Sequence, residues 1–271
     1  MSLRTEADFQ QSNNKRGTVK IGLIQHDINV DDVAATIAAV DEQVREAVDE
    51  GAEAVVLAEF WATGYHRDPS RIAEPIGGPI QQHMEQLAAE LGIVIFATVA
   101  VNDQGRYFNR MCVTGPEGTI ATYDKRQLFS YADEHLRYTP GHQSVTVEVR
   151  GLSVTPLVCY DLRFGPLFWT QALSTDCYVI SANWPDPRLE HWTALLTARA
   201  IENQAWVIGV NRVGQLDGLT FRGGSAVVDP WGVVRELPNG PNVLVVEVDA
   251  QLVSSTRRAF PVLNDWHPDR G

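Results

Sequence analysis

The sequence has few of the features that mark membrane, secreted or nucleic-acid-binding proteins. Its 271 residues include only 22 lysines and arginines against 34 aspartates and glutamates, a formal net charge of -12. This negative balance argues against a phosphate backbone or an anionic membrane as partner. No apolar run approaches the roughly 18 residues of a membrane-spanning helix, and the polar start MSLRTEADFQQSNNKRG lacks the apolar core of a signal peptide. We therefore expect a cytoplasmic protein that binds neither nucleic acid nor membrane.

Cysteine is scarce, and the patterns that bind metals or cofactors are missing. Cys112, Cys159 and Cys177 cannot all pair, and none stands in a CxxC or Cys/His pattern typical of zinc sites. The seven histidines show no HExxH spacing, and neither a Walker loop nor GxGxxG occurs. The stretch GGSAVVDP lacks the second glycine of a serine nucleophile elbow. We expect no metal and no cofactor.

The organisation of the chain is that of one large α/β unit. Residues 1–16 are polar and predict a flexible N-terminal arm, and no linker divides residues 17–271, which predict a single domain. Strands outnumber helices, too many for one doubly wound sheet. Two sheets packed face to face, with helices outside, fit better. The hydrophobic pattern indicates strands at 19–28, 52–60, 93–101, 144–149, 152–159, 176–184, 206–213, 223–230 and 242–249, a hairpin at 106–125 that turns at 115–118, and helices at 30–51, 78–92, 166–173 and 188–204.

Four ionisable residues stand where a predicted strand stops or a loop starts. They are Glu59 after AVVLA, Lys125 after IATYD, Glu134 in SYADEHLRY, and Cys159 after VTPLV. Strand ends in α/β folds often display catalytic groups, because the sheet fixes the side chain while the loop leaves it accessible. Taken singly, however, each residue also fits an ordinary role: a solvated carboxylate, a surface ammonium or a buried thiol.

The sequence motifs around these positions resemble those of the carbon-nitrogen hydrolase (nitrilase) superfamily, and most closely those of its omega-amidase-like branch. LAEFWATGY, TYDKRQLF with EHLRYTPG, LVCYDLRF, SANWP and HWTALLTARAIENQAWVIGVNRVG follow one another in the order and spacing of that family, over nearly the whole chain. The sequence departs from the branch at 165–169, where GPLFW stands and relatives usually have proline directly after the phenylalanine. The resemblance implies an α-β-β-α sandwich of two mixed sheets flanked by helices, which agrees with the surplus of strands.

The resemblance also implies a Glu-Lys-Cys triad of Glu59, Lys125 and Cys159. A free thiol is mostly protonated at neutral pH, so Glu59 would act as base while Cys159 attacks an amide carbonyl. The Lys125 ammonium and the backbone N–H of Tyr160 would stabilise the oxyanion, and water would hydrolyse the resulting thioester. Glu134 would orient Lys125 and help place substrate, or the two glutamates would simply balance the lysine's charge.

Substrate-binding residues are less clearly indicated. In related enzymes an arginine at the position of Arg163 can hold a substrate carboxylate, and a guanidinium offers paired donors for one. A salt bridge to Asp161 or near Glu59 is the alternative. Trp184, Tyr131 and Trp61 could wall the pocket, although large aromatic side chains are more often simply packed.

The resemblance therefore predicts an amidase that releases ammonia from a primary amide of a small carboxylate-bearing molecule, such as an omega-amide of a 2-oxo dicarboxylic acid. An N-carbamoyl amino-acid hydrolase, a deaminated-glutathione amidase and a nitrilase are alternatives within the superfamily. A catalytically silent binding or scaffold subunit is the alternative outside enzymes, but it would not need an intact triad. Members of the family commonly dimerise, so a homodimer or higher homo-oligomer is expected.

Overall fold

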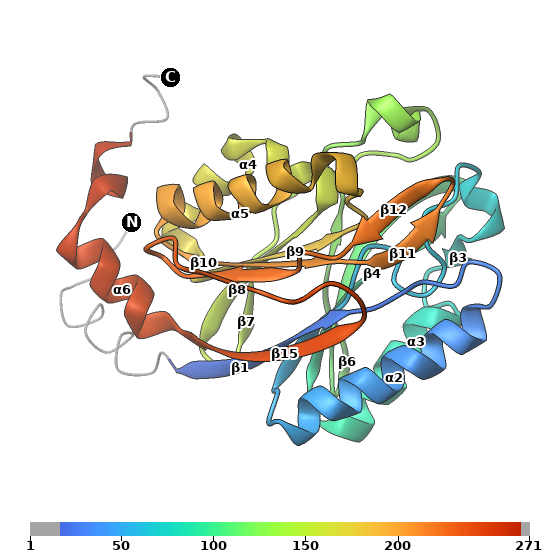
Figure 1. The fold of residues 1–271 in the computed structure, drawn as a ribbon, viewed down its shortest axis with the longest axis horizontal. Coiled ribbons are helices and arrows are strands. Elements are labelled where there is room, and N and C mark those ends of the chain that lie inside the picture. Colours follow the sequence, from blue (N-terminus) through green and yellow to red (C-terminus); the bar gives the residue numbers. More distant parts are fainter. Residues whose placement is uncertain (1–16, 267–271) are drawn as a thin grey trace.

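Two β-sheets face each other between helices in the computed structural model, which describes residues 17–266 (Figure 1). Within these residues the first sheet has the order β15-β1-β2-β4-β5-β6, with β3 beside β4, and the second has the order β14-β13-β10-β9-β8-β7. Both sheets mix parallel and antiparallel pairs. The predicted α-β-β-α sandwich is confirmed. The predicted arm at 1–16 lies outside the described residues, and the division into an arm and one domain stays a prediction.

The first sheet follows the predicted strand–helix alternation. Its helices α2 (Val33–Asp49) and α3 (Pro79–Leu91) lie on its outer side (Figure 1). Gly51 and Gly92 follow these helices with φ of 92° and 69°, the left-handed conformation that ends helices. The strands are β1 (Thr18–Gln25), β2 (Ala54–Val56), β3 (Glu74–Pro75), β4 (Val94–Asp103), β5 (Arg106–Gly115), β6 (Gly118–Asp124) and β15 (Asn242–Asp249).

The second sheet carries α4 (Gly165–Trp169) and α5 (Leu189–Asn203) on its outer side (Figure 1). Its central strands β8, β9 and β10 run parallel and are almost wholly buried, as expected for strands covered on both faces. The strands are β7 (Val147–Val149), β8 (Leu152–Val158), β9 (Cys177–Ala182), β10 (Trp206–Asn211), β13 (Ala226–Val228) and β14 (Val234–Glu236).

Alternating side chains divide the apolar interior into layers. Along β4, Phe96 belongs to the core between the sheets, whereas its neighbours Ile95 and Ala97 belong to the core under α2 and α3. This period of two is the geometry of a strand with both faces buried. The first sheet therefore serves two cores at once, which makes its strand ends rigid platforms.

Several elements were missed in the sequence, including the short strands β3 and β14. Residues 213–222 form a separate hairpin of β11 (Val213–Leu216) and β12 (Leu219–Arg222), and residues 250–259 form the helix α6 (Ala250–Ala259). Asp249 caps α6 by accepting a hydrogen bond from Gln251 N at 2.7 Å. The hairpin matters for function, because it reaches the cavity described below.

The ends of strands from the two sheets meet at one place. The chain after β2 touches the end of β9, where Glu59 N donates to Ala182 O at 3.3 Å. Ser181 in β9 likewise donates from Oγ to Leu57 O at 2.7 Å. The fold thus brings the carboxyl ends of β2, β8 and β9 together, the position at which α/β folds tend to place functional groups.

Candidate active site

Three charged side chains form a buried ion-pair cluster at these strand ends. Glu59 follows β2, Lys125 follows β6, and Glu134 begins the short 3₁₀-helix η3 (Glu134–Leu136). Lys125 Nζ donates to Glu59 Oε1 at 2.9 Å and to both carboxylate oxygens of Glu134 at 3.0 Å. All three side chains are buried. Two carboxylates therefore hold one ammonium in a fixed position.

Neighbouring donors orient the two carboxylates. Asn109 Nδ2, from β5, donates to Glu59 Oε1 at 2.7 Å and to Glu134 Oε1 at 3.4 Å. The backbone N–H of Asn183 donates to Glu59 Oε2 at 3.0 Å, and that of Phe129 donates to Glu134 Oε2 at 2.6 Å. Each carboxylate oxygen thus has a donor, so both groups keep their hydrogen bonds despite burial.

Cys159 stands on a sharp turn at the end of β8. It is the first residue of the 3₁₀-helix η4 (Cys159–Arg163) and has φ of 45°, a left-handed conformation that is strained for a non-glycine residue. Asp161 holds the turn in place: its carboxylate accepts from Val158 N at 3.0 Å, from Gln127 N at 2.8 Å and from Tyr123 Oη at 2.8 Å. Asp161 therefore ties the cysteine turn to the loop after Lys125.

The electrostatics of the site favour a protonated thiol beside an ionised lysine. Burial and the Glu59 carboxylate raise the pKa of the Cys159 thiol well above its usual value, and Lys125 only partly opposes them. Burial lowers the pKa of Lys125, but Glu134 and Glu59 outweigh it and raise that pKa well above the usual range. These shifts favour the neutral form of the thiol and the charged form of the ammonium.

Burial raises the pKa of Asp161 from 3.8 to about 6, although the hydrogen bond from Tyr123 and those from the Val158 and Gln127 backbones oppose the rise. The group that fixes the cysteine turn therefore titrates closer to neutrality than an ordinary aspartate.

A cavity of about 310 Å³ joins these groups. It is lined by all three members of the ion-pair cluster, Glu59, Lys125 and Glu134, and by Cys159. Leu216, Leu219 and Phe221 from the β11–β12 hairpin form part of the wall. A small polar molecule that enters this cavity reaches the thiol, the ammonium and a carboxylate together.

The remaining predicted site residues lie at different distances from this centre. Tyr160 belongs to the first turn of η4, where helical N–H groups lack an earlier carbonyl as partner. Arg163 and Trp184 line a recess of about 30 Å³ that Cys159 also borders. Arg163 makes no ion pair with Asp161 or with any other carboxylate among residues 17–266. Its guanidinium carbon instead lies 4.6 Å from the centre of the Trp184 ring.

Two aromatic residues do not take the places that the sequence suggested. Tyr131, expected as a wall of the pocket, is 85% exposed in the 3₁₀-helix η2 (Ser130–Ala132) and does not line the cavity. Its ring packs on Phe129, with centroids 5.7 Å apart. Trp61 is buried in the core under α2 and α3. Tyr65, which sequence reasoning passed over, lines the cavity instead.

Asn109, Asp161 and Asn183 are among the polar residues at the site that sequence reasoning missed. Asn109 is a buried amide in the strand YFNRMCV, and an amide among core residues is itself a signal. Asp161 was considered only as a partner for Arg163. Asn183 was quoted within SANWP without a role, yet its backbone contacts Glu59 and its side chain lies at the cavity.

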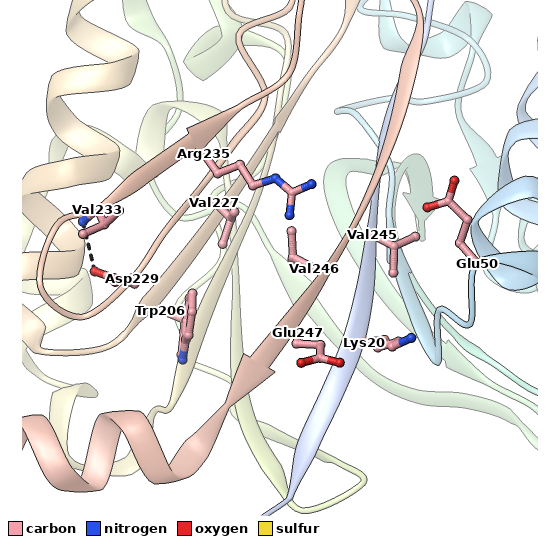
Figure 2. A pocket seen from close by; sticks show the side chains of 10 residues that line it. All are labelled: Lys20, Glu50, Trp206, Val227, Asp229, Val233, Arg235, Val245, Val246 and Glu247. Carbon is pink, nitrogen blue, oxygen red and sulfur yellow. Dashed lines mark hydrogen bonds between the residues drawn. The ribbon is translucent and has the colours of Figure 1, made fainter.

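A separate cavity of about 530 Å³ lies beside the edge strands β14 and β15 (Figure 2). Lys20 and Glu247 are cross-strand neighbours there, and Arg235 and Glu50 also line it. It shares no lining residue with the cavity at Cys159. Residues 17–266 contain no cluster of three histidine, cysteine or acidic side chains placed to hold a metal ion, and no helix within them is long and apolar enough to cross a membrane.

The comparisons with known proteins agree with this geometry. The sequence is 37% identical over 253 residues to the omega-amidase YafV of Escherichia coli (strain K12), covering 91% of this chain and 96% of that protein. It is 36% identical to the 2-oxoglutaramate amidase of Bacillus subtilis (strain 168), covering 80% of this chain and 86% of the relative.

A solved structure from Xanthomonas campestris, XC1258, described as a CN-hydrolase superfamily protein with an arsenic adduct in the active site, superimposes with a TM-score of 0.85. It is 33% identical and covers 93% of this chain and 98% of its own. The family model for carbon-nitrogen hydrolase matches residues 20–258. The chain therefore belongs to the carbon-nitrogen hydrolase (nitrilase) superfamily, in its omega-amidase-like branch, and is an amidase.

Proposed function

We propose that the protein hydrolyses the primary amide of a small carboxylate-bearing molecule and that Glu59, Lys125 and Cys159 carry out the reaction. The observation that supports this most directly is the Lys125 ammonium, held by two buried carboxylates in the same cavity that Cys159 lines. A purely structural ion pair would not need a strained cysteine beside it. The names of the relatives, omega-amidase and 2-oxoglutaramate amidase, point to the same substrate class.

In the proposed mechanism Glu59 takes the proton of Cys159 as the sulfur attacks the amide carbonyl carbon. The carbonyl oxygen becomes negative and is stabilised by the Lys125 ammonium and the Tyr160 backbone N–H. When the C–N bond breaks, Glu59 returns the proton to the leaving nitrogen, so that ammonia departs and a thioester remains. Glu59 then deprotonates a water molecule that attacks the thioester, and the proton passes back to sulfur as the acid is released.

Glu134 acts in this scheme as a positioning residue. Both of its oxygens contact Lys125 Nζ, and the backbone N–H of Phe129 fixes its orientation. Glu59 loses its negative charge when it takes the proton of Cys159. The second carboxylate, Glu134, then still holds the ammonium in place. The charge on Lys125 is therefore constant through the reaction.

The experiment that tests this function is ammonia release from a panel of omega-amides, N-carbamoyl amino acids, nitriles and deaminated glutathione. We expect the omega-amides to react fastest and Cys159→Ala to release no ammonia above background. Fastest turnover of another group would select one of the alternative reactions within the superfamily. Full activity of Cys159→Ala would refute the assigned nucleophile. A wild-type protein that reacts with nothing and resists thiol-directed labels would favour a binding or scaffold role.

We further propose a cytoplasmic homodimer formed through the outer face of α4 and α5. Trp169 in α4, Leu173 in the 3₁₀-helix η5 (Ala172–Ser174) and Ile201 in α5 are large apolar side chains left exposed, and such exposure is typical of interfaces. All three cysteines are unpaired, as suits a reducing compartment. Light scattering coupled to gel filtration tests the dimer: we expect twice the chain mass, reduced by Ile201→Glu. A monomeric wild type would refute it.

A further inference from the structure

The β11–β12 hairpin gives the cavity at Cys159 an apolar wall. Leu216, Leu219 and Phe221 line the cavity from this hairpin, whereas the ion-pair cluster and Cys159 line it from the strand ends. Phe221 is the most deeply buried of the three apolar side chains, with 5% of it exposed against 41% of Leu219. A primary amide has a polar end and an acyl chain, so its methylene groups suit the apolar side of such a cavity.

The hairpin stands apart from both large sheets. Its strands β11 and β12 pair with each other as a two-stranded sheet, at the end of the sandwich opposite α6 (Figure 1). A two-stranded hairpin on its own is at best marginally stable in water. The position of Phe221 therefore depends on the contacts that hold the two strands at their base.

Arg212, directly before β11, holds the first strand from inside the protein. Its side chain is fully buried. Nε donates to Val213 O at 3.0 Å, and Nη2 donates to Ile28 O at 3.0 Å and to Asp27 Oδ1 at 3.3 Å. Its guanidinium carbon lies 5.0 Å from the centre of the Phe221 ring. Because a guanidinium can stack on an aromatic ring and keep its in-plane hydrogen bonds, Arg212 ties this ring to the segment after β1.

Asp186 holds the second strand from the surface. It begins the 3₁₀-helix η6 (Asp186–Arg188), and its carboxylate accepts from Arg222 N at 2.8 Å and from Arg222 Nε at 2.7 Å. Hydrogen bonds between a guanidinium and a carboxylate are stronger than those between neutral groups. Arg222 directly follows Phe221, so this contact fixes the backbone beside the ring. The Arg222 side chain is 55% exposed, and the contact can therefore be removed without opening the core.

We propose that Phe221 is a specificity-determining residue that packs on the acyl chain of the substrate, and that Arg212 and Asp186 are positioning residues that hold its ring in the cavity wall. This inference rests on the proposed amidase function and deepens it. Arg212 contacts the ring itself, and Asp186 contacts the residue after it. Loss of either contact moves the wall and leaves the groups around Cys159 in place. The wall selects amides by the length of their acyl chain.

The test compares acetamide, propionamide and butyramide, which carry no charge and differ by one methylene each. Burial of one methylene against the wall should raise kcat/KM about fourfold in the wild type, and this gain should fall to about twofold or less in Phe221→Ala. Asp186→Ala should lower the gain in the same direction. It should change kcat/KM for acetamide less than about twofold, because acetamide has no methylene to bury against the wall.

Further variants separate positioning from a general loss of structure. Asp186→Ala added to Phe221→Ala should lower the gain per methylene no further, because the wall that Asp186 positions is already gone; a further fall would contradict the proposal. Asp27→Asn should act like Asp186→Ala by weakening the hold on Arg212, whose own substitution would leave buried carbonyls without a donor. Glu90→Ala, which breaks an exposed ion pair between α2 and α3, is the matched control and should leave all three amides unaffected.

A binding experiment separates this inference from the proposed reaction. Calorimetric titration of Cys159→Ala requires no catalysis, and butyramide should bind that variant about 16-fold more tightly than acetamide, at about fourfold for each methylene. Phe221→Ala in that background should reduce this ratio to about fourfold or less. An unchanged ratio would overturn the role of Phe221, and an equal fall for every amide in Asp186→Ala would overturn that of Asp186. A ratio that is lost in Phe221→Ala, in a protein that hydrolyses no amide, would instead refute the reaction and leave the wall intact.

Discussion

The substitution Glu134→Gln tests how the buried lysine is held. It keeps the size of the side chain and one acceptor oxygen, but removes the charge that faces Lys125 Nζ at 3.0 Å. At that separation the attraction between unit charges is about 5 kcal/mol for an effective dielectric constant near 20. Lys125 would then rely on Glu59 alone, against a burial that already disfavours its charged form. The pKa of Lys125 should therefore fall.

Two measurable effects follow from this loss. Removing one partner of a buried ion pair costs about 3–5 kcal/mol. Because the amide oxygen of the new glutamine can still accept a hydrogen bond, we expect a loss of unfolding free energy near the lower end of this range. Displacing an oxyanion donor costs about 3 kcal/mol of barrier, or roughly 100-fold in kcat/KM. The loss should grow with pH, because the neutral amine of Lys125 cannot stabilise an oxyanion.

The assay is ammonia release followed as kcat/KM from about pH 6 to pH 10, together with urea unfolding at neutral pH. Glu134→Asp retains the charge and should keep the alkaline limb where the wild type has it, even if the shorter side chain lowers the rate. Glu247→Gln removes an exposed carboxylate that does not line the cavity at Cys159, and it serves as the control for loss of charge alone. A parallel drop at every pH in Glu134→Gln, with no shift of the alkaline limb, would refute the idea that Glu134 keeps Lys125 charged.

Two further predictions concern the cysteine and its turn. Glu59→Gln should abolish ammonia release yet speed alkylation of Cys159 by iodoacetamide at neutral pH, because the Glu59 charge raises the pKa of that thiol; slower alkylation would show that Glu59 favours the thiolate. Asp161→Asn should change how stability depends on pH: the folded protein holds the Asp161 proton with a pKa of about 6 instead of 3.8, so this stabilisation is full below about pH 4 and is lost as the pH rises through 6. The unfolding free energy of the wild type relative to Asp161→Asn should fall by about 2 kcal/mol between pH 4 and 7, and a constant difference across urea titrations would contradict it.

Much of the fold could be predicted from local sequence patterns, because several helices and turns end at residues that favour such an end. The helix ends at Gly51 and Gly92, and the hairpin turn at 115–118, depend on backbone conformations that glycine adopts readily. The helix α6 was missed although Asp249 caps it, since AQLVSSTRRA has few strong apolar residues and buries only Ala250, Val253 and Thr256.

The candidate site was suggested by resemblance and not by position alone. Glu59 and Lys125 lie 66 residues apart, and no local pattern states that their side chains meet at 2.9 Å. Tyr131 shows the opposite case: it lies close in sequence to both Lys125 and Glu134, yet η2 turns it outward into solvent. Closeness along the chain therefore says little about the cavity wall, which includes Phe221 from a hairpin that the sequence pattern did not reveal.

The placement of the proposed base, Glu59, and the proposed nucleophile, Cys159, depends on two strained residues at the ends of strands in different sheets. Phe60, directly after Glu59, has φ of 49°, and Cys159 itself has φ of 45°. A left-handed conformation costs a non-glycine residue about 1–2 kcal/mol, so each needs support from elsewhere. Phe60 N donates to Thr98 Oγ1 on β4 at 2.6 Å, and Asp161 holds the turn at Cys159. The strand ends turn into one cavity because buried hydrogen bonds from neighbouring segments fix both bends, so a substitution such as Thr98→Val acts on the chemistry without touching substrate.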